Sequence, residues 1–292
     1  MKTIGSTIIM LALASSLFAD NGKELKLASP DGTHEIVFYQ KQVSPAVNEL
    51  CYRVDYKSQP VVNESRAGLE LDNRIWEMAL GVRNLKQPAC WMDNLEVDSV
   101  TYQPETNLTW QPLYGERSSV RDHYRAGTLC LSKKDNSGYR LNIEVRAYNE
   151  GVAFRYFFPE HPKAIFHKVV GDLTEYALPA GTKAWTEQWA QAFFERLNID
   201  DIKHPVERAL TFELPNGKWA ALADADVDDW CLTKYLVSTD KKNTLTSVMY
   251  SPVDVVTYYA TPWKIVMAAD KPGELLEHND IIQNLKDRKS VV

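Results

Sequence analysis

Short stretches in which apolar and polar residues alternate occupy most of the chain between residues 25 and 266. Typical stretches are rich in β-branched and aromatic residues: "HEIVFYQ" (34–40), "LCYRVDYK" (50–57), "TLCLSKK" (128–134) and "TSVMY" (246–250). Alternation with a period of two predicts strands that bury one face. Asn-Gly, Asp-Gly and Ser-Gly pairs between the stretches indicate tight turns.

The clearest hairpin joins residues 140–148 to residues 152–158 through "NEG". Helical periodicity is rare, and strands do not alternate with helices as they do in a parallel α/β sheet. No repeat of fixed length is visible in the sequence, which argues against a propeller or a solenoid. The pattern therefore predicts an all-β fold with few short helices, in which two large antiparallel sheets pack face to face.

The two ends of the chain differ from this pattern. Lys2 precedes an apolar run over residues 8–17, and Ala19 stands before Asp20, which predicts a signal peptide over residues 1–19. The run is too short to remain as a membrane span. Without a cysteine after the cleavage point we expect no lipid anchor, and hence a periplasmic protein. One domain is expected over residues 20–284, and the polar end of "IIQNLKDRKSVV", residues 285–292, is expected to form an unstructured tail.

Charge and cysteine content narrow the classes of partner. The formal net charge is −6, and lysines and arginines are scattered without a basic stripe, so we expect neither nucleic acid nor a membrane surface as a partner. Cys51, Cys90, Cys130 and Cys231 form no metal-binding spacing. The apolar strand-like contexts of Cys51, Cys130 and Cys231 favour buried free thiols, although an oxidising compartment leaves one disulfide as an alternative.

The stretch "AWTEQWAQAFFER" (184–196) combines aromatic rings with two glutamates. On a helix, residues four apart would form an apolar and a polar face: Trp185, Trp189 and Phe193, against Glu187, Gln191 and Glu195. On a loop at the rim of a β domain, the same side chains would place stacking rings beside hard carboxylate oxygens. Sugar and calcium sites are built in that way. The residues alone leave both interpretations open.

A second candidate lies in "TWQPLYGERSSVRDHY" (109–124), where Glu116 and His123 follow a turn-forming Gly115. As an acid and a base on a sandwich, the two residues would suit a mutarotase-like aldose epimerase. The alternative is a strand, a turn and a second strand whose charges form surface pairs. Spacing cannot show whether the two side chains meet.

Other acidic and histidine residues predict no metal centre. The aspartates of "ALADADVDDW" (221–230) lack the glycine and the distal glutamate of a calcium loop. Strand alternation instead predicts inward alanines and solvated carboxylates: Ala221, Ala223 and Ala225, against Asp224, Asp226 and Asp228. The remaining histidines are scattered: His34, His161, His167, His204 and His278. No nucleophile elbow, P-loop or dinucleotide fingerprint is present.

Six segments in a fixed order resemble the amino-terminal domain of glycoside hydrolase family 97, exported α-glucosidases and α-galactosidases. They are "SPDGTHEIVF", "TWQPLYGERSSVRDHY", "RAYNEGVAFRYFFP", "AWTEQWAQAFFER", "LPNGKWAALADADVDDW" and "YYATPWKIV", and the similarity covers residues 25–284. The resemblance implies a large β-supersandwich of the galactose mutarotase type. In the family this domain packs against a catalytic (β/α)8 barrel, which needs about 250 further residues.

The resemblance also implies roles for individual residues. Because the family's catalytic carboxylates come from the barrel, no catalytic residue is expected in this chain, which alone should be inactive. Glu195 matches the glutamate that reaches a calcium ion beside the sugar, with Glu187 as the alternative. Trp185 and Trp189 would shape the rim that meets an α-linked oligosaccharide. Two alternative functions are a free-standing carbohydrate-binding module and the mutarotase-like aldose epimerase described above.

Overall fold

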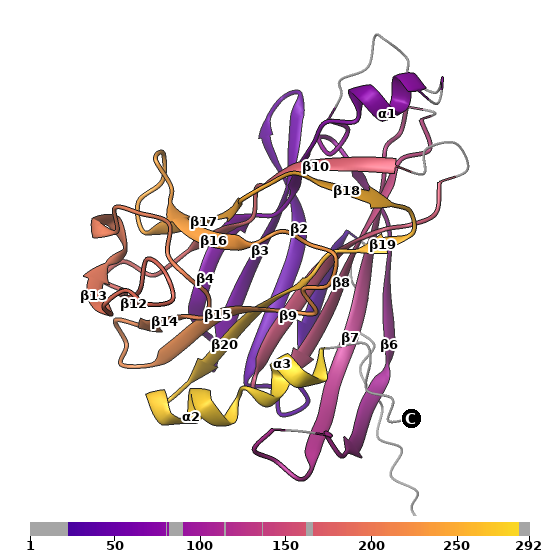
Figure 1. The fold of residues 1–292 in the computed structure, drawn as a ribbon. Helices are drawn as coiled ribbons and strands as arrows, with labels where there is room; N and C mark the ends of the chain where they lie inside the picture. The colour runs from indigo at the N-terminus through magenta and orange to yellow at the C-terminus, as the bar shows by residue number, and fades with distance from the viewer. Residues whose placement is uncertain are drawn as a thin grey trace, which may run out of the picture.

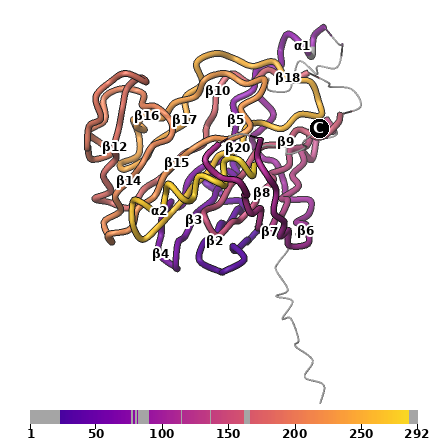
Figure 2. The backbone as a smooth tube through the Cα atoms, turned by 60° about the horizontal axis from the view of Figure 1, so that its bottom comes forward, coloured from indigo at the N-terminus to yellow at the C-terminus, as the bar shows by residue number. Residues whose placement is uncertain are grey.

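The structure is a computed structural model that describes residues 23–79, 81, 90–113, 115–135, 137–161 and 166–285. Antiparallel sheets packed in layers form the body of the molecule, with short helices at its margins (Figures 1 and 2). The predicted signal peptide and residues 286–292 of the predicted tail lie outside the described residues. The predicted all-β sandwich is confirmed.

The largest sheet contains ten strands within the described residues, and all neighbouring strands are antiparallel. From one edge to the other the order is β13 (Glu195–Asn198), β12 (Lys183–Thr186), β14 (Leu210–Glu213), β15 (Trp219–Ala225), β20 (Trp263–Ala269), β9 (Gly151–Phe158), β8 (Arg140–Tyr148), β7 (Val120–Ser132) and β6 (Glu96–Trp110). The short strand β19 (Tyr259–Ala260) also pairs with β9. We refer to this assembly as the large sheet.

Smaller sheets complete the sandwich. The four-stranded sheet, which packs on the large sheet, has the order β1 (Glu24–Ala28), β2 (His34–Ser44), β3 (Val47–Tyr56) and β4 (Gln59–Arg66). One three-stranded sheet consists of β18 (Val253–Val256), β10 (Phe166–Asp172) and β5 (Leu69–Leu71). The other consists of β11 (Glu175–Ala177), β17 (Thr244–Met249) and β16 (Thr233–Val237).

The helices are short, as the sequence predicts. They are α1 (Arg74–Ala79), the 3-10 turn η1 (Ile199–Asp201), α2 (Pro272–Glu277) and α3 (Asp280–Asn284). Pro272 stands in the first turn of α2, where its missing N–H is no loss. Among the described residues, no helix combines the length and the apolar character that a membrane crossing requires.

Strand alternation gives the large sheet two different faces. In β8, Leu141, Ile143 and Val145 are buried in the main core, while Glu144 and Arg146 point the other way and are only partly covered. We name the face toward the four-stranded sheet the inner face, and the opposite one the outer face. A second, smaller core forms on the outer face, where α2 and α3 pack against β15 and β20.

The predicted hairpin is confirmed, since β8 and β9 pair from Asn142 with Phe157 to Tyr148 with Gly151. A side chain at Gly151 would not fit, because a Cβ there would lie 2.6 Å from the Val266 carbonyl oxygen of β20. Glycine thus lets the next strand approach the hairpin closely.

The predicted start of the unstructured tail at Leu285 is wrong, because Leu285 is fully buried. Ile281, Asn284 and Leu285 are fully buried, because α3 lies against β7 and β15 and completes the outer core. The stretch "IIQNL" lies in a short amphipathic helix. Its apolar side chains are too few to show a helical period in the sequence.

Candidate functional site

The stretch 184–196 forms a hairpin at the edge of the large sheet, and the helical interpretation is wrong. Strand β12 pairs with β13 such that Thr186 lies opposite Glu195 and Trp185 opposite Arg196. The connecting loop, residues 187–194, turns through a hydrogen bond from the Ala192 N–H to the Trp189 carbonyl at 2.8 Å. A hairpin at a sheet edge projects its loop away from the core, which suits a contact surface.

Three aromatic side chains of this loop are exposed to an unusual degree. Phe193 is 94% exposed, Phe194 66% and Trp189 53%. We name these three residues the aromatic patch. Adjacent large apolar side chains in water are unfavourable for a monomer and typically mark a surface that meets a partner or a ligand.

Glu195 stands where the loop enters β13, and its side chain is exposed. Its backbone carbonyl accepts a hydrogen bond from the Thr186 hydroxyl at 3.2 Å, but no described side chain bonds its carboxylate. Because directly opposite residues share a face, Glu195 points to the same face as Thr186, which is the inner face. Its oxygens are therefore available to a cation or a donor from outside this domain.

The carboxylate of Glu195 fits calcium only as part of a shared site. Calcium takes six to eight oxygens, of which one carboxylate supplies at most two. Within the described residues, no group of three or more His, Cys, Asp or Glu side chains could hold a metal ion. Glu187, the alternative ligand, lies in the loop with a half-buried side chain, and its backbone carbonyl accepts the Glu207 N–H at 2.9 Å.

The two tryptophans lie in different surroundings. Trp189 belongs to the aromatic patch, whereas Trp185 points to the outer face, opposite to Glu195, by strand alternation. The Trp185 indole N–H donates to Glu213 at 2.8 Å, and Arg196 pairs with the same carboxylate. The hydrogen bond from Arg196 lowers the pKa of Glu213. Trp185 is thus held in a polar cluster on the other side of the hairpin.

A buried lysine, Lys234, anchors the loop, and the sequence analysis did not predict this role. Lys234 of β16 is buried, and its Nζ donates to the Gln188 carbonyl at 2.8 Å and pairs with Glu207 at 2.6 Å. The hydrogen bond with Glu207 raises the pKa of Lys234, which keeps its charge. The only sequence signal was a lysine within the apolar strand "TKYLV".

The proposed pairing of Glu116 with His123 is wrong. His123 lies in β7, and its Nε2 contacts Glu105 of the neighbouring strand β6 at 2.7 Å. Arg125 pairs with the same glutamate at 2.9 Å, so Glu105 belongs to a cross-strand charge cluster. Glu116 instead lies exposed in the β6–β7 turn. The strand, turn and strand alternative is confirmed.

The aspartate stretch is only partly solvated, which corrects another expectation. Asp228 and Asp229 are exposed, but the Asp224 side chain is 8% exposed, where it pairs with Arg208 and accepts a hydrogen bond from Thr233 at 3.0 Å. The inward positions of the alanines are confirmed, since all three are buried in the outer core. Both faces of β15 are covered, so its polar side chains had to find partners inside the protein.

Next to Asp224, a buried ion pair joins Lys264 of β20 to Asp172 of β10. Burial disfavours the charged form of Lys264, but attraction to Asp172 and Asp224 exceeds that effect and raises its pKa. The three side chains line a small pocket with the Tyr156 ring and Trp230. The cluster connects the large sheet with a three-stranded sheet, and its role is structural.

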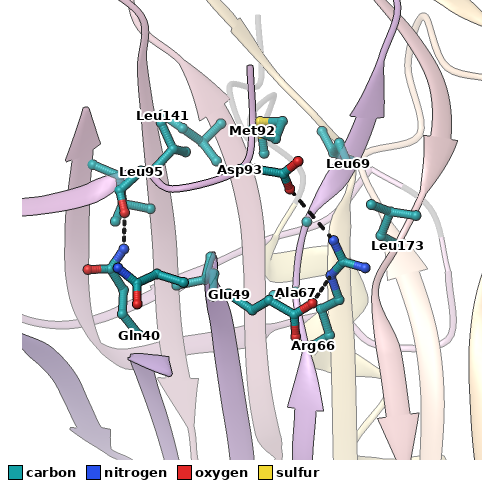
Figure 3. Close-up of a pocket in the computed structure, with 14 residues that line it drawn as sticks. Gln40, Glu49, Arg66, Ala67, Leu69, Met92, Asp93, Leu95, Leu141 and Leu173 are labelled. Carbon is teal, nitrogen blue, oxygen red and sulfur yellow. Dashed lines mark hydrogen bonds and ion pairs between the residues drawn. The ribbon is translucent and has the colours of Figure 1, made fainter. Parts of the chain in front are cut away.

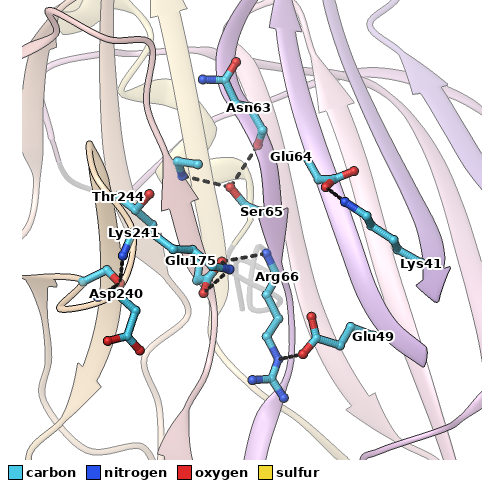
Figure 4. A network of polar contacts seen from close by, with 12 residues as sticks. Lys41, Glu49, Asn63, Glu64, Ser65, Arg66, Glu175, Asp240, Lys241 and Thr244 are labelled. Atoms are coloured by element: carbon cyan, nitrogen blue, oxygen red, sulfur yellow. Dashed lines mark hydrogen bonds and ion pairs between the residues drawn. The ribbon is translucent and has the colours of Figure 1, made fainter. Parts of the chain in front are cut away.

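A pocket between the sheets is lined in part by charged side chains that pair with one another. In Figure 3, Arg66 lies between Glu49 at 3.7 Å and Asp93 at 3.9 Å, in a pocket that Leu69, Leu95, Leu141 and Leu173 also line. Figure 4 shows that the Arg66 N–H also donates to Glu175, which Lys241 approaches at 2.7 Å. These contacts tie β4 to the β11–β17 sheet, and we assign them to stability.

The cysteines are free thiols in the structure, Cys51 buried and the other three half-buried, so no pair of them forms the alternative disulfide. Burial raises the pKa of Cys51 to about 11, which makes it an unreactive thiol.

Comparison with known proteins identifies the family. Residues 27–287 match the family described as "Glycosyl-hydrolase 97 N-terminal". A retaining α-galactosidase from Bacteroides thetaiotaomicron is 23% identical over 295 residues, covering 94% of this chain. The chain spans only 38% of the length of that relative.

Solved structures give the same result at the level of the fold. A glycoside hydrolase family 97 enzyme from Pseudoalteromonas sp. strain K8, solved in complexes with panose and with acarbose, is 21% identical with a TM-score of 0.72. The match covers 85% of this chain and 36% of that chain. A β-arabinopyranosidase matches with a TM-score of 0.69 at 16% identity, over 84% of this chain and 40% of that chain. Because the family match extends over nearly the whole chain, the protein belongs to the glycosyl-hydrolase 97 N-terminal domain family.

Proposed function

We propose that this protein is the non-catalytic β-sandwich domain of an exported α-glycosidase, and that its edge hairpin completes an active site built mainly by a catalytic barrel. The observation that carries the proposal is the exposure of the aromatic patch beside the available carboxylate of Glu195. An apolar surface of this kind gains stability when a partner covers it. The α-galactosidase relative has a length that leaves room for such a catalytic domain.

Glu195 would act as a calcium ligand in the combined site. Its side chain lies at the base of the hairpin loop, and a loop anchored by Lys234 would present it with little loss of conformational freedom. Glu187 is the weaker choice, because its side chain is half-buried and its backbone is fixed to Glu207. The calcium ion would supply positive charge next to the sugar, and the other oxygens would come from the barrel.

Trp189 is the aromatic residue best suited to contact an α-linked oligosaccharide, since it belongs to the loop that leads into Glu195. Trp185 would contribute from the rim only, because its ring lies on the outer face and its N–H is held by Glu213. Two of the three similar proteins support α-linked sugars as the substrate class, and the third is a β-arabinopyranosidase. One is an α-galactosidase, and another was solved with panose and acarbose.

The secretory features of residues 1–19 support export to the periplasm. Secretion would bring the domain to the compartment where oligosaccharides enter the cell. Fractionation of cells that express the full gene tests this location, with cleavage before Asp20 measured by mass spectrometry.

Activity and calcium assays on the purified mature chain test the main proposal. The chain alone should hydrolyse neither nitrophenyl α-glucoside nor nitrophenyl α-galactoside, and calorimetry should detect only weak calcium binding. Turnover of either substrate, or tight calcium binding by the single domain, would contradict the proposal.

Sequencing the DNA downstream of the last codon tests whether a catalytic barrel follows this domain in the same reading frame. If an in-frame barrel follows, Glu195→Gln in the longer protein should weaken calcium binding and lower kcat, while Glu187→Gln should leave both close to wild type. Equal effects of the two substitutions would show that Glu195 is not the ligand.

A free-standing carbohydrate-binding module is the second candidate, which the exposed rings of Trp185 and Trp189 favour. It requires measurable affinity of the isolated chain for α-linked oligosaccharides. Affinity electrophoresis with panose, and with Trp189→Ala as the control variant, separates the two functions. Binding that depends on Trp189 without any partner would support the module.

A further inference from the structure

The edge hairpin consists of β12, the loop 187–194 and β13, and it receives little support from the ladder of the large sheet. Strand β13 has four residues and pairs with β12 alone among the described strands. The side chains of the aromatic patch are exposed, so they add little packing to the loop. So short an edge strand opens easily unless other contacts hold it.

One set of contacts holds the second leg of the hairpin on the outer face of the large sheet. Arg196 of β13 reaches past β12 to Glu213 of β14, where its Nε donates to one carboxylate oxygen at 2.8 Å and a terminal nitrogen donates to the other. The Trp185 N–H of β12 donates to the same carboxylate at 2.8 Å. A two-pronged arginine contact fixes direction as well as distance. We name Arg196 and Glu213 the arginine clamp.

A second set of contacts holds the first leg, from β16 of a neighbouring sheet (Figure 1). The Lys234 ammonium donates to the Gln188 carbonyl at 2.8 Å and pairs with Glu207 at 2.6 Å, while the Glu207 N–H donates to the Glu187 carbonyl at 2.9 Å. The side chains of Lys234 and Glu207 are only 8% and 19% exposed. Shielding from water makes this pair stronger than an ordinary surface pair. We name Lys234 and Glu207 the lysine clamp.

Glu195 lies between the two clamps and takes part in neither. It directly precedes Arg196, and it pairs across the hairpin with Thr186, the residue before Glu187. The arginine clamp therefore holds the chain on one side of the loop and the lysine clamp holds it on the other. The backbone of Glu195 is fixed by contacts that leave its own carboxylate exposed. A ligand that is already in place loses little conformational entropy on binding.

We propose that Lys234 and Arg196 are positioning residues, which hold the edge hairpin in one conformation through the two clamps and thereby fix where the Glu195 carboxylate meets a calcium ion. The role of calcium rests on the proposed function. The order of the hairpin, in contrast, can be measured without calcium and without a catalytic domain. Loss of either clamp should release one leg of the loop while the body of the sandwich stays folded.

Limited proteolysis of the purified mature chain with chymotrypsin measures how often the hairpin opens. Chymotrypsin cleaves after aromatic residues, and the aromatic patch supplies exposed sites in the loop. The protease needs an extended segment, so the rate of cleavage follows the population of opened hairpin. Lys234→Met and Arg196→Met should each raise this rate at least about fivefold. Lys241→Met, which breaks an exposed pair with Glu175, should leave it unchanged.

A double variant separates positioning from a purely structural role. Lys234→Met leaves Glu207 without its partner and should lower the melting temperature, whereas adding Glu207→Met should restore it, because two apolar side chains replace a shielded ion pair. Rapid cleavage should persist in the double variant, since the Gln188 carbonyl still lacks its donor. Slow cleavage in the double variant, or cleavage as slow as in wild type in both single variants, would overturn the proposal.

The calcium role and the clamps are tested separately. Glu195→Gln should not change the rate of cleavage, because this carboxylate belongs to neither clamp. A failure of the calcium role would appear in the calorimetry and leave the cleavage rates as expected. A failure of the clamps would appear in the cleavage rates alone.

Discussion

Single residues in the interior show how this sandwich accommodates charge. Lys264 and Asp172 are both buried, and the hydroxyl of Ser247 lies 3.4 Å from the Lys264 ammonium. Removing two charges from water is costly, so the pair holds only because each partner neutralises the other. Loss of either partner would leave an isolated charge in an apolar environment.

Lys264→Met should therefore lower the free energy of unfolding by about 3–5 kcal/mol, because Asp172 remains as an unpaired buried carboxylate. Urea denaturation followed by tryptophan fluorescence measures the change. The control is Lys168→Met, which breaks an exposed pair with Asp254 at 3.5 Å and should cost less than about 1 kcal/mol. Similar losses in both variants would contradict a special role for the buried pair.

Two buried histidines are held in the neutral form. Burial lowers the pKa of His34 to about 4, and the neighbouring His278 adds to this effect. The Nε2 of His34 donates to the Ala268 carbonyl at 3.2 Å, which fixes the neutral tautomer. Burial likewise lowers the pKa of His167 to about 4, and its Nδ1 accepts from the Asn73 amide at 2.8 Å.

These histidines predict a loss of stability in mild acid. Below the unfolded-state pKa of about 6.5, the unfolded chain binds protons that the folded chain excludes until about pH 4. The free energy of unfolding should fall across this window as pH falls, by up to roughly 3 kcal/mol for each histidine. Urea denaturation at a series of pH values from about 7 to about 4 measures how the free energy of unfolding changes with pH. This range includes the ordinary histidine pKa and the lowered one.

The matched variants isolate this contribution from that of the carboxylates. His34→Gln with His167→Gln should flatten the pH dependence, whereas His204→Gln, at an exposed position, should not change it. An unaltered slope in the double variant would show that other groups cause the acid sensitivity.

At the scale of elements, the strands were predictable and the outer-face helices were not. The hairpin of β8 and β9 follows from a period of two, since one apolar face must be buried for the strand to be stable. Helix α3 has five residues and presents too few apolar positions to show a helical period. The packing of Ile281 and Leu285 against β7 and β15 determines that helix, and such long-range contacts are not visible in sequence spacing.

Asn284 provides a test of how firmly α3 is attached. Its side-chain amide donates to the Arg121 carbonyl at 2.8 Å and accepts from the Trp110 indole N–H at 2.8 Å. Asn284→Ala should cost about 1–3 kcal/mol, because the Trp110 indole N–H and the Arg121 carbonyl lose their hydrogen-bond partner at a partly buried site. Hydrogen exchange of α3 should accelerate in this variant and remain slow in Gln283→Ala, a half-buried neighbour. Equal exchange in both variants would contradict the role assigned to Asn284.

At the scale of the whole molecule, the family resemblance predicted the fold, but the chemistry of the candidate site depended on geometry. Spacing four apart in residues 184–196 was compatible with a helix, and only pairing of β12 with β13 placed Glu195 and Trp185 on opposite faces. The partner of His123 was missed for the same reason, because Glu105 is eighteen residues away in sequence and adjacent only across strands. Register between strands decides which polar groups meet, and local composition does not encode it.

The exposed aromatic patch predicts how the isolated molecule behaves in solution. Phe193 and Phe194 contribute little to the folded core, so their cost is the free energy of apolar surface in water, about 25 cal/mol per Å². Two chains can remove this surface from water by associating through the patch when no other domain covers it. The isolated mature chain should therefore self-associate as concentration rises.

Phe193→Ser with Phe194→Ser should weaken this association at least tenfold and leave the melting temperature unchanged, because no buried contact is lost. Sedimentation velocity over a range of concentrations measures the first effect, and thermal denaturation the second. Tyr102→Ser is the control, since Tyr102 is a similarly exposed aromatic residue on the distant edge strand β6. Reduced association in the control as well would indicate general surface stickiness, whereas an effect confined to the patch identifies it as the surface that a second domain would cover.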